Sequence, residues 1–257
     1  MIVEAYFLTW FMIFVRAGAM LSVFPIFSAT AMPIRVRIAL AAFLAMLSLP
    51  GVPLPPGFLE TSLMTFTGYV AQELFYGLIL GFVCRLIMFA MALAGHFVGT
   101  ELGLQLSSFI APGESQPTTT PSVMLQMMAV MLMLALDIHF ELLMGFQQTY
   151  AALPIGGGQL SNALFETLSS LCGQTFVLAL RIAAPIMAVG IVVNLLMMVL
   201  ARTIPQMNVF VESFSVRIIV GVSLFGFTLS LAAKEISNYL RKLPEDFAVV
   251  TRLLGGG

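Results

Sequence analysis

Charged residues are scarce in this chain. Only 9% of its 257 residues are Asp, Glu, Lys or Arg, whereas 60% are hydrophobic and the mean hydropathy is +1.04. Soluble domains are about 25% charged and about 45–50% apolar, so this composition is typical of a membrane protein. The 11 basic residues are scattered and the net charge is −1, which gives no basic surface for nucleic acid and none dense enough for anionic lipid.

Cysteine and catalytic motifs are also sparse. Cys84 and Cys172 lie in apolar stretches and form no CxxC pair; buried, inert thiols are the favoured interpretation, with a disulfide left open. HExxH, GxSxG, P-loop and GxGxxG motifs are missing from the sequence. Asp137, His139 and Glu141 resemble a metal triad, but at 100° per residue His139 lies about 200° around a helix from Asp137. The sequence therefore predicts no enzyme, no cofactor and no metal site.

A basic N-terminal region, the mark of a signal peptide, is missing as well. The chain begins Met-Ile-Val-Glu, and Arg16 interrupts its first apolar run. Residues 5–28 are therefore expected to be a retained helix.

Apolar segments separated by Pro, Gly and polar stretches predict an all-α membrane protein with a single domain over residues 1–257. The apolar segments are residues 5–28, 33–49, 63–106, 122–136, 161–202 and 209–233, followed by an amphipathic, solvated helical tail at 234–257. The third segment is too long for one span and is either one long helix or a hairpin. Pro185 is expected to kink or split the fifth.

Ionisable residues interrupt nearly every one of these segments. A charge at the centre of a bilayer costs about 2.5–3.5 kcal/mol on insertion scales. We therefore expect these residues to be buried and satisfied by other helices or other subunits, with protein or a wet channel covering much of the helix surface. A proton relay is the less favoured alternative, because arginines are as frequent as acids. The residues concerned are Arg16, Glu73, Arg85, Arg181 and Arg217.

Glycines and methionines recur at helical spacing. Glycines four residues apart let another backbone approach closely, and we expect a partner subunit there; they are Gly77, Gly81, Gly95, Gly99 and Gly103. Four methionines form one stripe, for which a core position is the default interpretation and a deformable seal beside a passage the alternative. These are Met124, Met127, Met128 and Met131.

Several sequence stretches occur together in a specific order. They are PIF (25–27), PIRVR (33–37), GHFVGTELGLQL (95–106), FIAPG (109–113), LPIG (153–156), AP (184–185) and NLLMMVLARTIPQMNVF (194–210). In this order they resemble the flagellar branch of the FliR/SctT family of type III export gates, over essentially the whole chain.

This resemblance implies a structural, channel-forming subunit of the flagellar export gate in the bacterial inner membrane, at the basal body. FliP and FliQ would join it in a helical assembly, FlhB would wrap that assembly and FlhA would lie beneath it. Unfolded flagellar subunits would pass through the channel. The alternatives are the equivalent subunit of a virulence injectisome and a stand-alone secondary transporter.

The resemblance also implies a plug-like loop at 107–122, with Phe109 and Ile110 at the narrowest point of the channel. A polar, proline-containing loop at membrane depth is tolerated only inside protein or beside water, which agrees with this placement. The predicted plug residues are Ser107, Ser108, Phe109, Ile110, Pro112, Gly113, Pro117 and Pro121.

Overall fold

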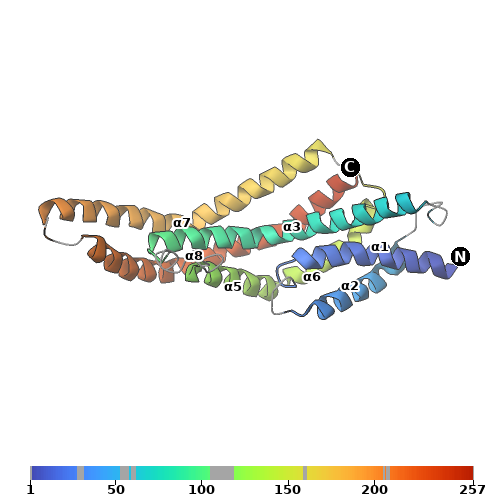
Figure 1. Cartoon of the computed structure of the whole chain (residues 1–257), viewed down its shortest axis with the longest axis horizontal. Helices are drawn as coiled ribbons and strands as arrows, with labels where there is room; N and C mark the ends of the chain where they lie inside the picture. The colour runs from blue at the N-terminus through green and yellow to red at the C-terminus, as the bar shows by residue number, and fades with distance from the viewer. Residues whose placement is uncertain are drawn as a thin grey trace. The chain divides into compact units, whose positions relative to one another are not determined.

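The computed structural model describes residues 2–27, 32–52, 58, 62–104, 119–158, 161–204, 206 and 209–256. Within these ranges every regular element is helical, so the predicted all-α fold is confirmed. The elements are α1 (Ile2–Val23), α2 (Ile34–Ser48), the 3₁₀ turn η1 (Leu49–Gly51), α3 (Leu63–Glu101), α5 (Thr120–Ala135), α6 (Ile138–Ala152), α7 (Asn162–Thr203) and α8 (Val209–Leu254) (Figure 1).

The helices contribute to two compact units. The first comprises Met1–Leu86, Met133–Cys172 and Leu240–Gly257, and the second comprises Ile87–Leu132 and Gly173–Tyr239. Helices α3, α5, α7 and α8 therefore each supply residues to both units.

In the first unit, α1 lies side by side with α2 (Figure 1). The indole Nε1 of Trp10 donates a hydrogen bond to the carbonyl of Ala42 over 3.3 Å, which joins the two helices through a long side chain. The last part of α8 also packs into this unit, since Leu240, Leu243 and Phe247 are almost completely buried. The tail predicted to be solvated is thus amphipathic as expected, but its apolar face is covered by protein.

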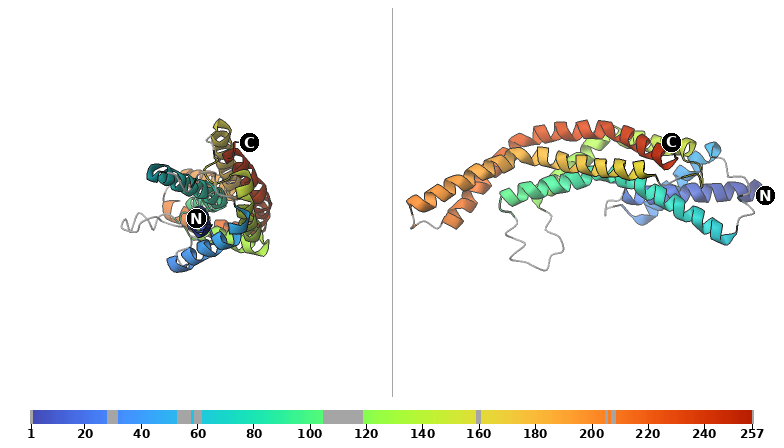
Figure 2. Two further views of the ribbon diagram at one scale, coloured as in Figure 1. Left: turned by 90° about the vertical axis from the view of Figure 1, so that its right-hand side faces the viewer. Right: turned by 90° about the horizontal axis from the view of Figure 1, so that it is seen from above.

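In the second unit, residues 173–203 of α7 and 209–239 of α8 lie side by side (Figure 2). Helix α7 continues through Pro185 over 42 residues, so the proline does not split it. The ambiguous third segment is one helix of 39 residues rather than a hairpin.

The fourth predicted segment, 122–136, corresponds to α5, and the structure has a further helix, α6, directly after it. Asp137 separates α5 from α6 and adopts a left-handed conformation with φ of 57°. Asp and Asn tolerate this region better than most residues other than glycine, because their short side chains bond locally. The polar step at 137–141 is therefore a helix break.

Among the described residues, five helices are long and apolar enough to cross a membrane, or up to six if α5 and α6 form one broken span. Their apolar windows are covered unequally by the rest of the described chain: 56% is buried for α3, but only 22% for α7 and 11% for α8. Most of the apolar surface of α7 and α8 is therefore left for other molecules to cover.

Candidate functional site

The predicted plug falls mostly outside the described residues. This applies to Ser107, Ser108, Phe109, Ile110, Pro112, Gly113 and Pro117. Pro121, the last predicted plug residue, is buried in the first turn of α5. Placing the loop as far as residue 122 was therefore wrong, because the helix already begins at Thr120. Proline suits a first helical turn, where its missing N–H has no intrahelical acceptor.

A buried ion pair joins α1 to α3 in the first unit. Arg16 and Glu73 are both completely buried. The Nε and Nη2 groups of Arg16 donate to the two carboxylate oxygens of Glu73 over 2.6 and 2.8 Å. This bidentate arrangement is the strong form of a guanidinium–carboxylate contact. The two residues lie 57 positions apart in the sequence.

Helix α6 and the residue after it complete the coordination of Arg16. Nη1 donates to Thr149 Oγ1 over 3.2 Å and to the carbonyl of Leu153 over 3.1 Å, and Nη2 donates to the same carbonyl over 3.2 Å. The ring of Tyr150 lies 4.0 Å from the guanidinium carbon. All the N–H directions of Arg16 are thus used within the chain. A buried charge is tolerated only when it is satisfied in this way.

The other predicted buried charges lie in different surroundings. Arg85 is half-buried in α3. The side chain of Arg181 is 68% exposed, with Nη1 at 4.0 Å from Glu235 Oε2 of α8. Within this chain Arg181 therefore lies on an outward side of α7, and its burial by another subunit stays a prediction. Arg217 is half-buried and donates through Nη2 to Asn194 Oδ1.

The spaced glycines on α3 allow close backbone approach, but by the same chain. A Cβ on Gly77 would overlap the carbonyl oxygen of Arg16 and lie 2.7 Å from Ala19 Cβ. A Cβ on Gly81 would lie 2.7 Å from the carbonyl oxygen of Met20. On this face, α1 of the same chain therefore packs where a partner subunit was predicted.

The next glycines along α3 meet the beginning of α5. A Cβ on Gly95 would overlap the backbone of Ser122, and one on Gly99 would lie 2.5 Å from Thr119 Cγ2. Gly103 differs from both, because it lies beyond the end of α3 with φ of 72°. The N–H groups of Gly103 and Leu104 donate to the carbonyls of Thr100 and Gly99, which is a Schellman cap. Gly103 therefore ends the helix, and its assignment to a helix-packing face was wrong.

The methionine stripe lies on the surface of α5. Met124, Met127 and Met131 are 46%, 60% and 67% exposed, and Met128 is half-buried. The face of α5 that packs inward carries Leu125 and Ala129 instead. The default interpretation of a core stripe is thus wrong for this chain, and the seal stays a prediction.

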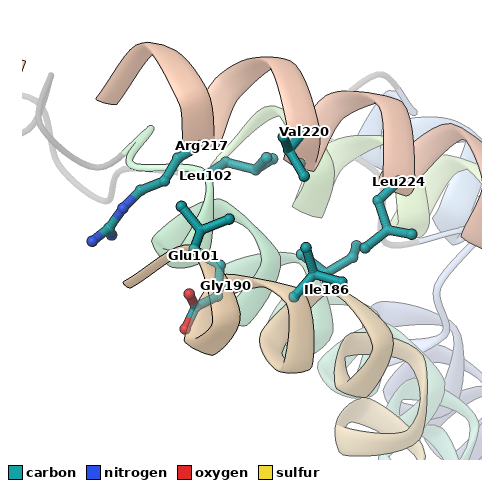
Figure 3. Close-up of a pocket in the computed structure, with 10 residues that line it drawn as sticks. Glu101, Leu102, Ile186, Gly190, Arg217, Val220 and Leu224 are labelled. Carbon is teal, nitrogen blue, oxygen red and sulfur yellow. The ribbon is translucent and has the colours of Figure 1, made fainter. Parts of the chain in front are cut away.

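A small pocket in the second unit is lined by two charged residues from different helices. Glu101 at the end of α3 and Arg217 of α8 line it, with apolar walls from α7 and α8 (Figure 3). The Nε of Arg217 is buried and has no acceptor within the described ranges. A sequence signal did exist, since Arg217 and Glu101 each interrupt an apolar run, but nothing in it paired the two segments.

The fold and these sites define an all-α integral membrane protein that buries one ion pair between helices and leaves much apolar helix surface uncovered. The chain matches the family "Bacterial export proteins, family 1" over residues 7–243 and belongs to it.

Several flagellar biosynthetic proteins FliR are similar to the chain along most of their length. The protein of Escherichia coli (strain K12) is 27% identical over 244 residues, which cover 91% of this chain and 92% of that protein. The Caulobacter vibrioides protein is 26% identical over 236 residues (92% and 94%), and the Bacillus subtilis (strain 168) protein is 24% identical over 260 residues (97% and 96%). The chain is thus a structural subunit of a flagellar export apparatus in the bacterial inner membrane.

Proposed function

We propose that this chain is a channel-forming subunit of the flagellar type III export gate, through which unfolded flagellar subunits cross the inner membrane. FliP and FliQ are its partners in the gate, FlhB wraps it and FlhA lies beneath it. The residues from Ser107 to Pro117 supply the plug at the narrowest point, and Met124, Met127, Met128 and Met131 supply the deformable seal.

The observation that carries the proposal is the uncovered surface of α7. This apolar helix exposes Ile191, Leu195 and Met198 by more than half. The same helix exposes Arg181, and a guanidinium facing hydrocarbon costs about 2.5–3.5 kcal/mol on insertion scales. A protein partner that covers the apolar residues and supplies acceptors for Arg181 removes both costs, whereas lipid removes only the first.

Two alternatives lead to different expectations. A stand-alone transporter would bury its intramembrane charges internally, whereas the side chain of Arg181 is 68% exposed and its pairing with Glu235 is long, at 4.0 Å, which speaks against this. A virulence injectisome subunit would share the mechanism and differ in its cargo. The similar proteins named above are all flagellar, which favours flagellar cargo.

Co-purification tests the assembly. We expect the chain to form one stable hetero-oligomer when it is co-expressed with FliP and FliQ, and to aggregate in detergent when it is expressed alone, because detergent covers the apolar residues of α7 but supplies no protein acceptor for Arg181. Size-exclusion chromatography coupled to mass determination measures both. A monodisperse monomer that ignores FliP and FliQ would contradict the proposal.

A loop replacement tests the plug. Residues 108–118 are replaced by a Gly/Ser linker of equal length, which keeps Thr119 because its hydroxyl donates to the carbonyl of Gly95 over 2.9 Å. Cells that overproduce the gate are expected to leak potassium ions, since a hydrophobic constriction blocks ions by excluding water. The control is a gate carrying the same linker appended after Gly257, matched for abundance. Equal leak rates in the two strains would argue against a plug at this position.

A further inference from the structure

Leu102, the residue just after α3, is held in a notch on α8. It is 2% exposed, and a Cβ on Gly221 would overlap its Cδ2 and lie 3.4 Å from its Cγ. Only glycine at 221 leaves room for this side chain. The neighbouring Glu101 uses a second notch, since a Cβ on Gly190 of α7 would lie 2.8 Å from its Cδ (Figure 3).

The turn that follows these two residues is also fixed. Gly103 adopts φ of 72° in the Schellman cap, a conformation that other residues rarely adopt. A Cβ on Gly103 would lie 3.1 Å from the ring of Phe214 on α8. The chain therefore leaves α3 through a turn that is held by contacts on three consecutive residues.

At the beginning of α5, Thr119 and Ser122 pack against two further glycines of α3, Gly99 and Gly95. Thr119 is 6% exposed, contacts Gly99 and donates from its hydroxyl to the carbonyl of Gly95. Ser122 is 5% exposed and lies on the backbone of Gly95. All the contacts at both ends fall within the second unit.

We propose that Glu101, Leu102, Thr119 and Ser122 are positioning residues, which fix both ends of the chain between Leu104 and Thr119 in glycine notches of α3, α7 and α8. This inference rests on the proposed function, because the segment they hold contains the proposed constriction. The four notches are Gly95, Gly99, Gly190 and Gly221. A glycine has no side chain that could rearrange. The two ends of this segment therefore keep a fixed separation during export, and we call them the fixed frame.

A cysteine pair tests the geometry independently of the channel. In a background with Cys84→Ala and Cys172→Ser, the variants Leu102→Cys and Gly221→Cys are combined. A Cβ at 221 would lie 3.4 Å from Leu102 Cγ and more than 4 Å from Leu102 Cβ, which puts the two cysteine Cβ atoms toward the upper end of the separation of about 3.5–4.5 Å that a disulfide needs. We expect an intramolecular disulfide on mild oxidation, detected by mass spectrometry, in a gate that still assembles and exports. Failure to cross-link, or loss of export that reduction restores, would overturn the fixed frame.

A steric change tests the function of the contact. Gly221→Ala is expected to displace Leu102 and make the assembled gate leak potassium, and Leu102→Ala in the same chain is expected to restore the seal by removing the overlapping methyl groups. Gly226→Ala on the same helix is the control, because a Cβ there meets nothing within 4 Å in the described part of the chain. Co-purification with FliP and FliQ checks that each variant assembles.

The outcomes separate this inference from the proposed function. A leak in the Gly221→Ala gate that Leu102→Ala removes supports the positioning role. If Gly221→Ala behaves as Gly226→Ala while the loop replacement leaks, the plug stands and the positioning role is overturned. If neither variant leaks although the disulfide forms, the proposed plug is wrong, and the positioning role falls with it while the cross-linked geometry stands.

Discussion

Arg16→Met is expected to destabilise the chain by about 3–5 kcal/mol, because it leaves the fully buried Glu73 without its counter-charge. The carbonyl of Leu153 loses both of its guanidinium donors at the same time. We expect the variant to fall to a small fraction of the wild-type abundance in membranes and to abolish swimming in soft agar. Quantitative immunoblotting of membranes and the motility assay measure the two effects.

A second substitution shows whether the lone charge is the cause. Arg16→Met combined with Glu73→Met removes both charges, and replacing a whole buried pair by apolar residues is often neutral. We expect most of the abundance to return, with a remaining loss of about 1–3 kcal/mol for the unsatisfied Leu153 carbonyl. Arg35→Met, which removes an exposed arginine of α2, is the control for loss of a positive charge. A double variant as scarce as the single one would contradict this account.

Gly77→Ala is expected to have the second largest effect. The added methyl overlaps the backbone carbonyl of Arg16, so α1 must move away from α3 and carry the ion pair with it. Overpacking of this kind costs about 1–3 kcal/mol. The thermal midpoint of the purified gate complex should fall accordingly.

The same helix supplies the control for this substitution. Gly68 is exposed on α3, and a Cβ there meets nothing within 4 Å among the described residues. Gly68→Ala should therefore raise the midpoint slightly, since alanine is better than glycine in a helix interior by about 1 kcal/mol. Equal midpoints for the two variants would show that the contact of Gly77 with α1 is unimportant.

The helices themselves were largely predictable from the sequence, because apolar runs and their Pro and Gly boundaries depend on local chemistry. The choice between a hairpin and one helix for α3 was not, since five glycines suit either a turn or close packing. In the structure four of them are packed within the helix and only Gly103 ends it. Helix α7 likewise continues through Pro185, so the proline did not show whether that segment is one helix or two.

The sequence predicted which charged residues need partners, but it did not predict which residues pair with one another. The sequence identified Arg16 and Glu73 as residues that need partners, but 57 residues separate them, and periodicity says nothing about which helices meet. Helical periodicity also identifies the apolar face of a helix, but it does not show whether protein, lipid or water covers that face. For this reason the tail after residue 234 was expected to be solvated and is partly buried, whereas Met124, Met127 and Met131 were expected in the core and are exposed.

The coordination of Arg16 has a consequence for biogenesis. Its carboxylate partner is synthesised 57 residues later and its carbonyl partner 137 residues later. At about 5–20 residues per second, Arg16 is synthesised about 3–11 s before Glu73. During that interval the nascent helix carries an unneutralised guanidinium that resists lateral entry into lipid. We therefore expect stable integration of α1 to follow the synthesis of α3, so that the N-terminal helices insert as a group instead of one by one.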